Sequence, residues 1–73
     1  ERLDLAIEAF QTALKAKPNS SDVYRINEQI ARLYVQKNDK ENALIYANQA
    51  YEKAPEAHKE RLSTFIQQIQ QLP

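Results

Sequence analysis

Apolar residues recur every three or four positions along nearly the whole chain, a spacing that places them on one side of a helix. The pattern is interrupted at Pro18, at the run from Lys37 to Asp39, and at Pro55. A proline ends a helix because it lacks the amide hydrogen and disfavours helical geometry in the residue before it. The chain is therefore expected to form four amphipathic helices, over residues 2–17, 22–36, 40–53 and 56–72.

The residues at the ends and inner sides of these segments support that division. Asp39 is a suitable N-cap for the third helix, and one of Ser20, Ser21 or Asp22 should cap the second. Four helices joined by short connections predict an all-α stack of antiparallel neighbours. The inward stripes of the third and fourth helices should comprise Ala43, Leu44, Ala47, Ala50, Tyr51, Leu62, Phe65, Ile66, Ile69 and Leu72.

The amino-acid composition argues against several classes of protein. Glycine and cysteine are absent, so the chain has no glycine-rich loop for phosphate or a cofactor and no thiol nucleophile. A single histidine, His58, lacks the neighbours of a metal site or a catalytic relay. We therefore expect neither an enzyme nor a cofactor.

Charge and hydropathy bear on partners and location. Ten basic and ten acidic residues cancel, which argues against nucleic acid. No segment has the roughly 20 apolar residues of a membrane span. The expectation is a soluble chain, with the cytoplasm favoured. Because the sequence starts at Glu1 and has no methionine, we expect a segment of a longer protein.

Two segments of the chain repeat one another. Residues 6–18 read AIEAFQTALKAKP and residues 43–55 read ALIYANQAYEKAP, 37 positions later. Both have alanine at the first and eighth positions, apolar residues at the second, fifth and ninth, and a final proline. Small residues one turn apart let helices approach closely, so the segments should be the same helix of two consecutive units.

This pattern resembles the tetratricopeptide repeat (TPR) family. The second helix of that repeat has the pattern A-x3-F followed by a proline, and the first has W-x2-L-G-x2-Y. The second-helix pattern is matched by Ala6, Phe10, Ala13 and Pro18, and again by Ala43, Ala50 and Pro55. In the first-helix pattern, Ile30, Ala31 and Tyr34 match with conservative replacements, whereas Asn27 occupies the tryptophan position.

The resemblance implies an α-solenoid of helix-turn-helix repeats. Residues 2–17 would be the second helix of a partial repeat, residues 22–54 one full repeat, and residues 56–72 a terminal or capping helix. It also implies a scaffold for protein–protein interaction, in which a peptide or protein partner lies on the concave face. That face would be lined by the first helices of successive repeats.

Residues 22–36 supply the predicted concave face. Arg25 and Arg32 are seven residues apart, so both guanidinium groups should point the same way and can bind a carboxylate or phosphate. The alternative is a solvated surface, in which Glu28 and Arg32 form an exposed intrahelical pair worth about 0.3 to 0.5 kcal/mol. The complete predicted set is Arg25, Glu28, Gln29, Arg32, Val35 and Gln36.

The sequence also indicates a second contact surface and two alternative functions. Ile45 and Tyr46 fall outside the inward stripe, where a neighbouring subunit or the fourth helix would cover them. Self-association is an alternative function, because Leu3, Ile7 and Leu14 should be exposed where a preceding helix would pack. A more remote alternative is RNA binding by a similar helical-hairpin repeat.

Overall fold

A computed structural model describes residues 2–73, and this part of the chain contains four helices and no strand. The helices are α1 (Arg2–Ala16), α2 (Val23–Gln36), α3 (Lys40–Lys53) and α4 (Glu56–Gln70). They account for 81% of the structure, which confirms the all-α prediction. The predicted boundaries agree within one residue except at the end of α4, which stops two residues earlier than expected.

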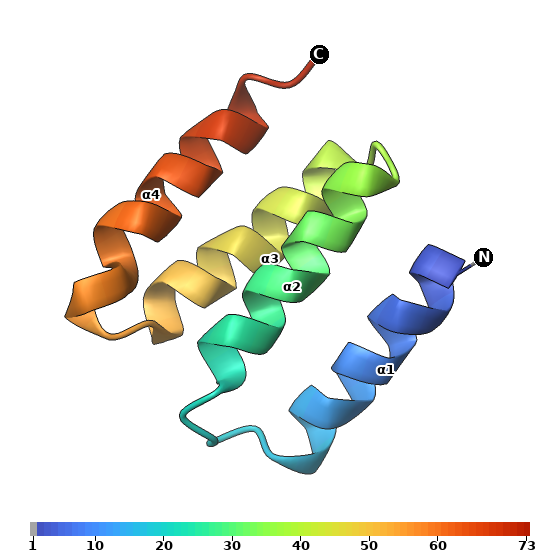
Figure 1. The fold of residues 1–73 in the computed structure, drawn as a ribbon, viewed down its shortest axis with the longest axis vertical. Coiled ribbons are helices and arrows are strands. Elements are labelled where there is room, and N and C mark those ends of the chain that lie inside the picture. Colours follow the sequence, from blue (N-terminus) through green and yellow to red (C-terminus); the bar gives the residue numbers. More distant parts are fainter. Residues whose placement is uncertain (1) are drawn as a thin grey trace.

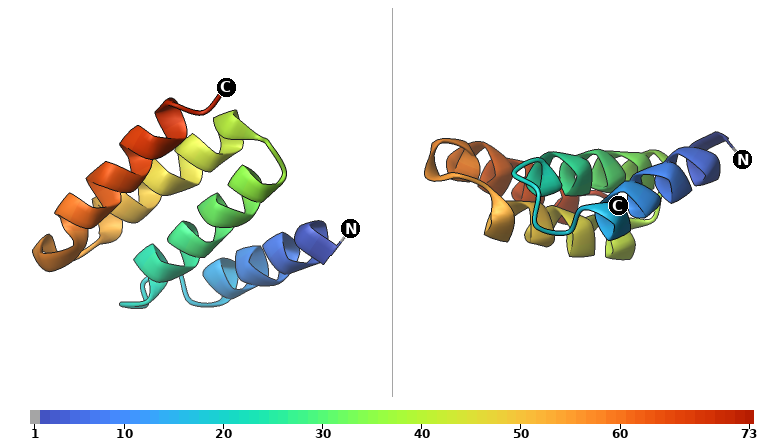
Figure 2. Two further views of the ribbon diagram at one scale, coloured as in Figure 1. Left: turned by 45° about the horizontal axis from the view of Figure 1, so that its top comes forward. Right: turned by 90° about the horizontal axis from the view of Figure 1, so that it is seen from below.

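The helices form a flat stack in which each helix packs on the next one along the chain (Figure 1). The Cα positions extend over 34 × 33 × 13 Å, so the stack is little thicker than one helix. Seen along its edge, the stack has α3 displaced to one side of α2 (Figure 2). Helices two apart in the chain can therefore meet, and two such contacts define the sites described below.

The core is divided into two clusters, both formed by α2, α3 and α4, and Ala54, which follows α3, contributes to one of them. One cluster contains Tyr24, Ala50, Ala54 and Leu62. The other contains Ala31, Ala43, Ala47 and Ile69. The three α3 alanines at positions 43, 47 and 50 are fully buried, and their small size allows α2 and α4 to approach α3 closely. Ile69 occupies the space beside Ala47, the position where the repeat pattern has an aromatic residue.

In the turn between α2 and α3, an asparagine takes the position where a glycine is common. Asn38 has φ of 62°, in the left-handed region that glycine commonly occupies after a helix. The next amide, from Asp39, donates to the Tyr34 carbonyl at 2.9 Å. The Asp39 carboxylate then accepts a bond from the Asn42 amide at 3.1 Å, which confirms the predicted N-cap.

The start of α2 differs from the prediction. Asp22 is the N-cap residue but makes no side-chain cap hydrogen bond. The Ser20 hydroxyl instead accepts from the Asp22 amide at 3.1 Å, forming a local turn before the helix. The expectation that a serine or aspartate side chain caps α2 was therefore wrong.

Several predicted inward or outward positions are also corrected. Leu72 is 38% exposed because α4 has ended, and Pro73 disfavours helical geometry at the preceding residue. Tyr51 is 36% exposed, with the Lys59 ammonium 4.5 Å from its ring centroid. On α1, Ile7 is only 4% exposed, whereas Leu5 is 66% exposed. The prediction that Ile7 is exposed was wrong.

Candidate partner-binding groove

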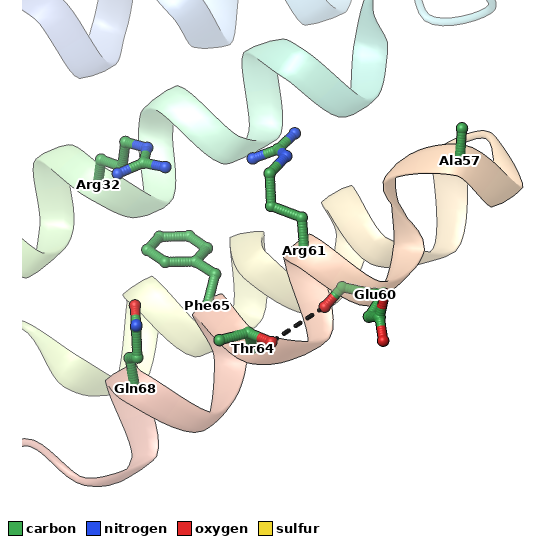
Figure 3. A pocket seen from close by; sticks show the side chains of 7 residues that line it. All are labelled: Arg32, Ala57, Glu60, Arg61, Thr64, Phe65 and Gln68. Atoms are coloured by element: carbon green, nitrogen blue, oxygen red, sulfur yellow. Dashed lines mark hydrogen bonds between the residues drawn. The ribbon is translucent and has the colours of Figure 1, made fainter.

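An open hollow of about 500 Å³ lies between α2 and α4, and we call it the α2–α4 groove (Figure 3). Most of its lining comes from α4, and one residue comes from α2. This contact between helices two apart follows from the stacking of both on α3. The lining residues are Arg32, Ala57, Glu60, Arg61, Thr64, Phe65 and Gln68.

Glu28 fixes the two arginines of the groove. Its side chain is buried, and its carboxylate accepts two bonds from Arg61, Nη1 to Oε2 at 2.6 Å and Nη2 to Oε1 at 3.2 Å. Arg32 Nη2 donates to the same Oε2 at 2.9 Å. The expectation of an exposed Glu28–Arg32 pair was therefore wrong, since Glu28 is buried and links α2 to α4.

The electrostatics of this cluster favour an ionised Glu28. Burial raises the pKa of the carboxyl group, but the hydrogen bonds and charges of Arg61 and Arg32 outweigh burial and lower the pKa below its ordinary value. The side chains of Arg32 and Arg61 are 50% and 48% exposed. One carboxylate thus holds two guanidinium groups whose remaining surface faces solvent.

Phe65 provides the apolar part of the groove. The Arg32 guanidinium carbon lies 4.8 Å from the centre of its ring, within cation–π range. Thr64 uses its hydroxyl to donate to the Glu60 carbonyl at 3.2 Å, a bond that Figure 3 shows as a dashed line. The groove therefore offers arginine N–H donors beside an aromatic surface, which suits a carboxylate or carbonyl next to an apolar side chain.

The other predicted residues of α2 lie elsewhere. Arg25 is exposed, and its Nε donates to the Tyr24 hydroxyl at 3.2 Å, so the structure does not bring it together with Arg32. Gln29 and Gln36 are exposed and do not line the groove. Val35 lines a separate hollow at the far end of α2, together with Leu72 and Pro73 of the chain end.

The predicted site contained neither Arg61 nor Phe65, because Arg61 was not singled out and Phe65 was assigned to the inward stripe of residues 56–72. A signal for Arg61 does exist. It lies 33 residues after Glu28, close to the length of one repeat, so the two residues occupy related positions on helices two apart. Repeat spacing could have suggested an ion pair between these helices.

Ile45 and Tyr46 have different environments. Tyr46 is half-buried: its ring stacks on Tyr34 at 5.7 Å, and its hydroxyl accepts from Gln11 Nε2 at 3.0 Å. These contacts come from α2 and α1. Ile45 is 47% exposed, so the expectation that the fourth helix would cover it was wrong.

Across residues 2–73, no group of three or more histidine, cysteine, aspartate or glutamate side chains is placed to hold a metal ion. None of the helices in that range has the length and apolar character needed to cross a bilayer.

Two pairs of antiparallel helices, with a shared alanine pattern and contacts between helices two apart, define a helical-repeat fold. Comparison with protein families agrees: the model of the tetratricopeptide repeat matches residues 24–56. This segment, which contains nearly all of α2 and all of α3, is a tetratricopeptide repeat. Such repeats generally mediate protein–protein interaction. No curated protein and no solved structure matched the chain.

Proposed function

We propose that the chain is a segment of a protein-interaction scaffold and that the α2–α4 groove binds a peptide segment of a protein partner. The observation that carries this proposal is the pair of half-exposed arginines held by one buried carboxylate beside Phe65. The preferred segment has a carboxylate for Arg32 or Arg61 and an adjacent apolar side chain for the Phe65 ring.

The arrangement is suited to binding because the arginines are already ordered. Each guanidinium has five N–H donors, and Glu28 occupies one donor group of Arg32 and two of Arg61. The remaining donors stay available, while the bonds to Glu28 restrict the side-chain rotamers. A restrained side chain loses less conformational entropy on binding than a free one.

A selection from a random peptide library tests this function directly. Peptides that bind the chain would be titrated against the variants Phe65→Ala and Arg32→Gln, with Arg25→Gln as the matched control. We expect at least a tenfold loss of affinity, about 1.4 kcal/mol, in each groove variant and none in the control. Selected peptides that bind all three variants equally well would overturn the groove assignment.

The outer surface of α4 suits a capping role for this helix. The side of α4 turned away from the core is polar, since Gln67, Gln68, Gln70 and Gln71 are all exposed. A terminal helix with a polar outer surface keeps a repeat array soluble. We therefore propose that α4 is a terminal or capping helix and that α1 is the second helix of a partial repeat.

Self-association is a second candidate function, favoured by the outer face of α1. Leu5 is 66% exposed on this helix, and Ala9, one turn later, is also exposed. Of the residues expected to form such a surface, Leu3 and Leu14 are half-buried and Ile7 is buried, so the contact would centre on Leu5. Sedimentation over a concentration series should show association that Leu5→Glu abolishes, and a strictly monomeric chain would refute it.

A further inference from the structure

A smaller hollow, which we call the α1–α3 hollow, lies where α1 and the following connection approach α3. Its volume is about 280 Å³. Leu14 of α1, Pro18 of the connection and Val23 of α2 form its apolar lining, and Gln49 lines it from α3. Ligand pockets usually measure about 300 to 1,000 Å³, so this hollow suits a single side chain.

Asn27 gives the hollow a specific chemical requirement. It is one of the lining residues and is only 3% exposed. Its Nδ2 donates to the Val23 carbonyl at 3.1 Å, whereas its Oδ1 is the one buried side-chain polar atom in residues 2–73 without a hydrogen-bond partner. Exchanging the amide oxygen and nitrogen would place two acceptor oxygens against each other, at Asn27 and Val23, and would leave the nitrogen unpaired. An unpaired buried acceptor is costly, and a ligand that brings a donor removes that cost.

The lining residues also restrict the kind of chemical group that can bring the hydrogen-bond donor. A charged ammonium group would be desolvated against Leu14, Pro18 and Val23, which is unfavourable without a buried counterion. Glu52 and Lys53, the remaining lining residues, have opposite charges and select for neither sign. The ligand that fits is therefore an uncharged, mainly apolar group with one polar hydrogen. The indole of tryptophan meets this requirement, because its N–H is a donor and it has no acceptor.

We propose that the α1–α3 hollow binds a tryptophan side chain of a protein partner, with the indole N–H donating to Asn27 Oδ1. The chain contains no tryptophan, so a second copy cannot supply this group. Asn27 itself occupies the tryptophan position of the repeat pattern, so a small polar side chain stands where that pattern has a large ring.

The test uses N-acetyl-L-tryptophanamide as the probe, with its 1-methylindole derivative as the matched control that lacks only the N–H. Two-dimensional NMR of the 73-residue chain should show saturable shifts at Leu14, Val23, Gln49 and the Asn27 side-chain amide. The 1-methyl compound should bind about fivefold more weakly, the usual net effect of one hydrogen bond.

The variant Asn27→Leu supplies the reciprocal control, because it removes the acceptor and should make the two compounds bind equally. If this variant does not fold, the two compounds compared on the unsubstituted chain still decide the question. Equal affinity of the unsubstituted chain for both compounds would overturn the proposal. The proposal would also be overturned if the lining residues showed no shifts, which would mean that only water occupies the hollow, or if the shifts were confined to the α2–α4 groove.

Discussion

The substitution Arg61→Met tests whether the link between α2 and α4 stabilises the stack. It keeps most of the aliphatic stem and removes both hydrogen bonds to Glu28, at 2.6 and 3.2 Å. Glu28 then remains buried with Arg32 as its one partner. Breaking a fully buried pair costs about 3 to 5 kcal/mol, whereas exposed pairs contribute about 0 to 1 kcal/mol.

The expected loss lies between these limits, because the Glu28 side chain is 8% exposed and that of Arg61 is 48% exposed. Because solvent screens the half-exposed arginine, we expect the free energy of unfolding to decrease by about 2 kcal/mol. For a domain of this size, that corresponds to a decrease in Tm of roughly 8 to 16 °C. Thermal unfolding followed by circular dichroism at pH 7 measures the difference, with Arg25→Met as the matched control.

Acidification provides a second, independent readout. The Glu28 carboxyl has a pKa lowered from about 4.5, so its stabilising effect is present above that value and is lost as the pH falls through the folded-state pKa. The difference between the wild type and Arg61→Met should therefore shrink at low pH. The reasoning would be refuted if Arg61→Met and Arg25→Met had equal stability at pH 7, or if the difference did not change on acidification.

Three further substitutions probe local features, each measured by thermal or urea unfolding. Asn38→Gly should raise stability by about 0.5 kcal/mol and Asn38→Ala should lower it by about 1 kcal/mol, because only glycine adopts positive φ without a steric cost; the opposite order would contradict the turn geometry. Asp39→Ala should lower Tm by removing the N-cap of α3, whereas an unchanged Tm would show that the cap bond is dispensable. Asn27→Leu should raise stability by about 1 kcal/mol, because it removes a buried unpaired oxygen; a loss of similar size would show that water satisfies this atom.

The helices were predictable because their determinants are local. Pro18 and Pro55 end helical segments through their own covalent structure, and the apolar spacing between them has a helical period. Asp39 was recognisable as an N-cap because its partner, the Asn42 amide, is three residues away. The duplicated alanine pattern likewise indicated close helix packing, which the buried alanines of α3 confirm.

The site and the orientation of α1 depend on residues far apart in the sequence. Glu28 is buried because Arg61, 33 residues later, lies over it, and this requires the register of α4 on α3. For α1, apolar residues occur on two adjacent stripes, one containing Ile7 and the other containing Leu5. The spacing alone does not decide which stripe faces α2, because that choice depends on the packing partner.

The distribution of buried residues gives the stack a gradient of local stability. Ile7 is the only buried residue among the 15 of α1, and neither core cluster contains a residue of α1. Opening of α1 therefore leaves the clusters intact, whereas opening of α3 would dismantle both. In hydrogen exchange, we therefore expect the amides of α1 to belong to the earliest unfolding unit and those of α3 to the last.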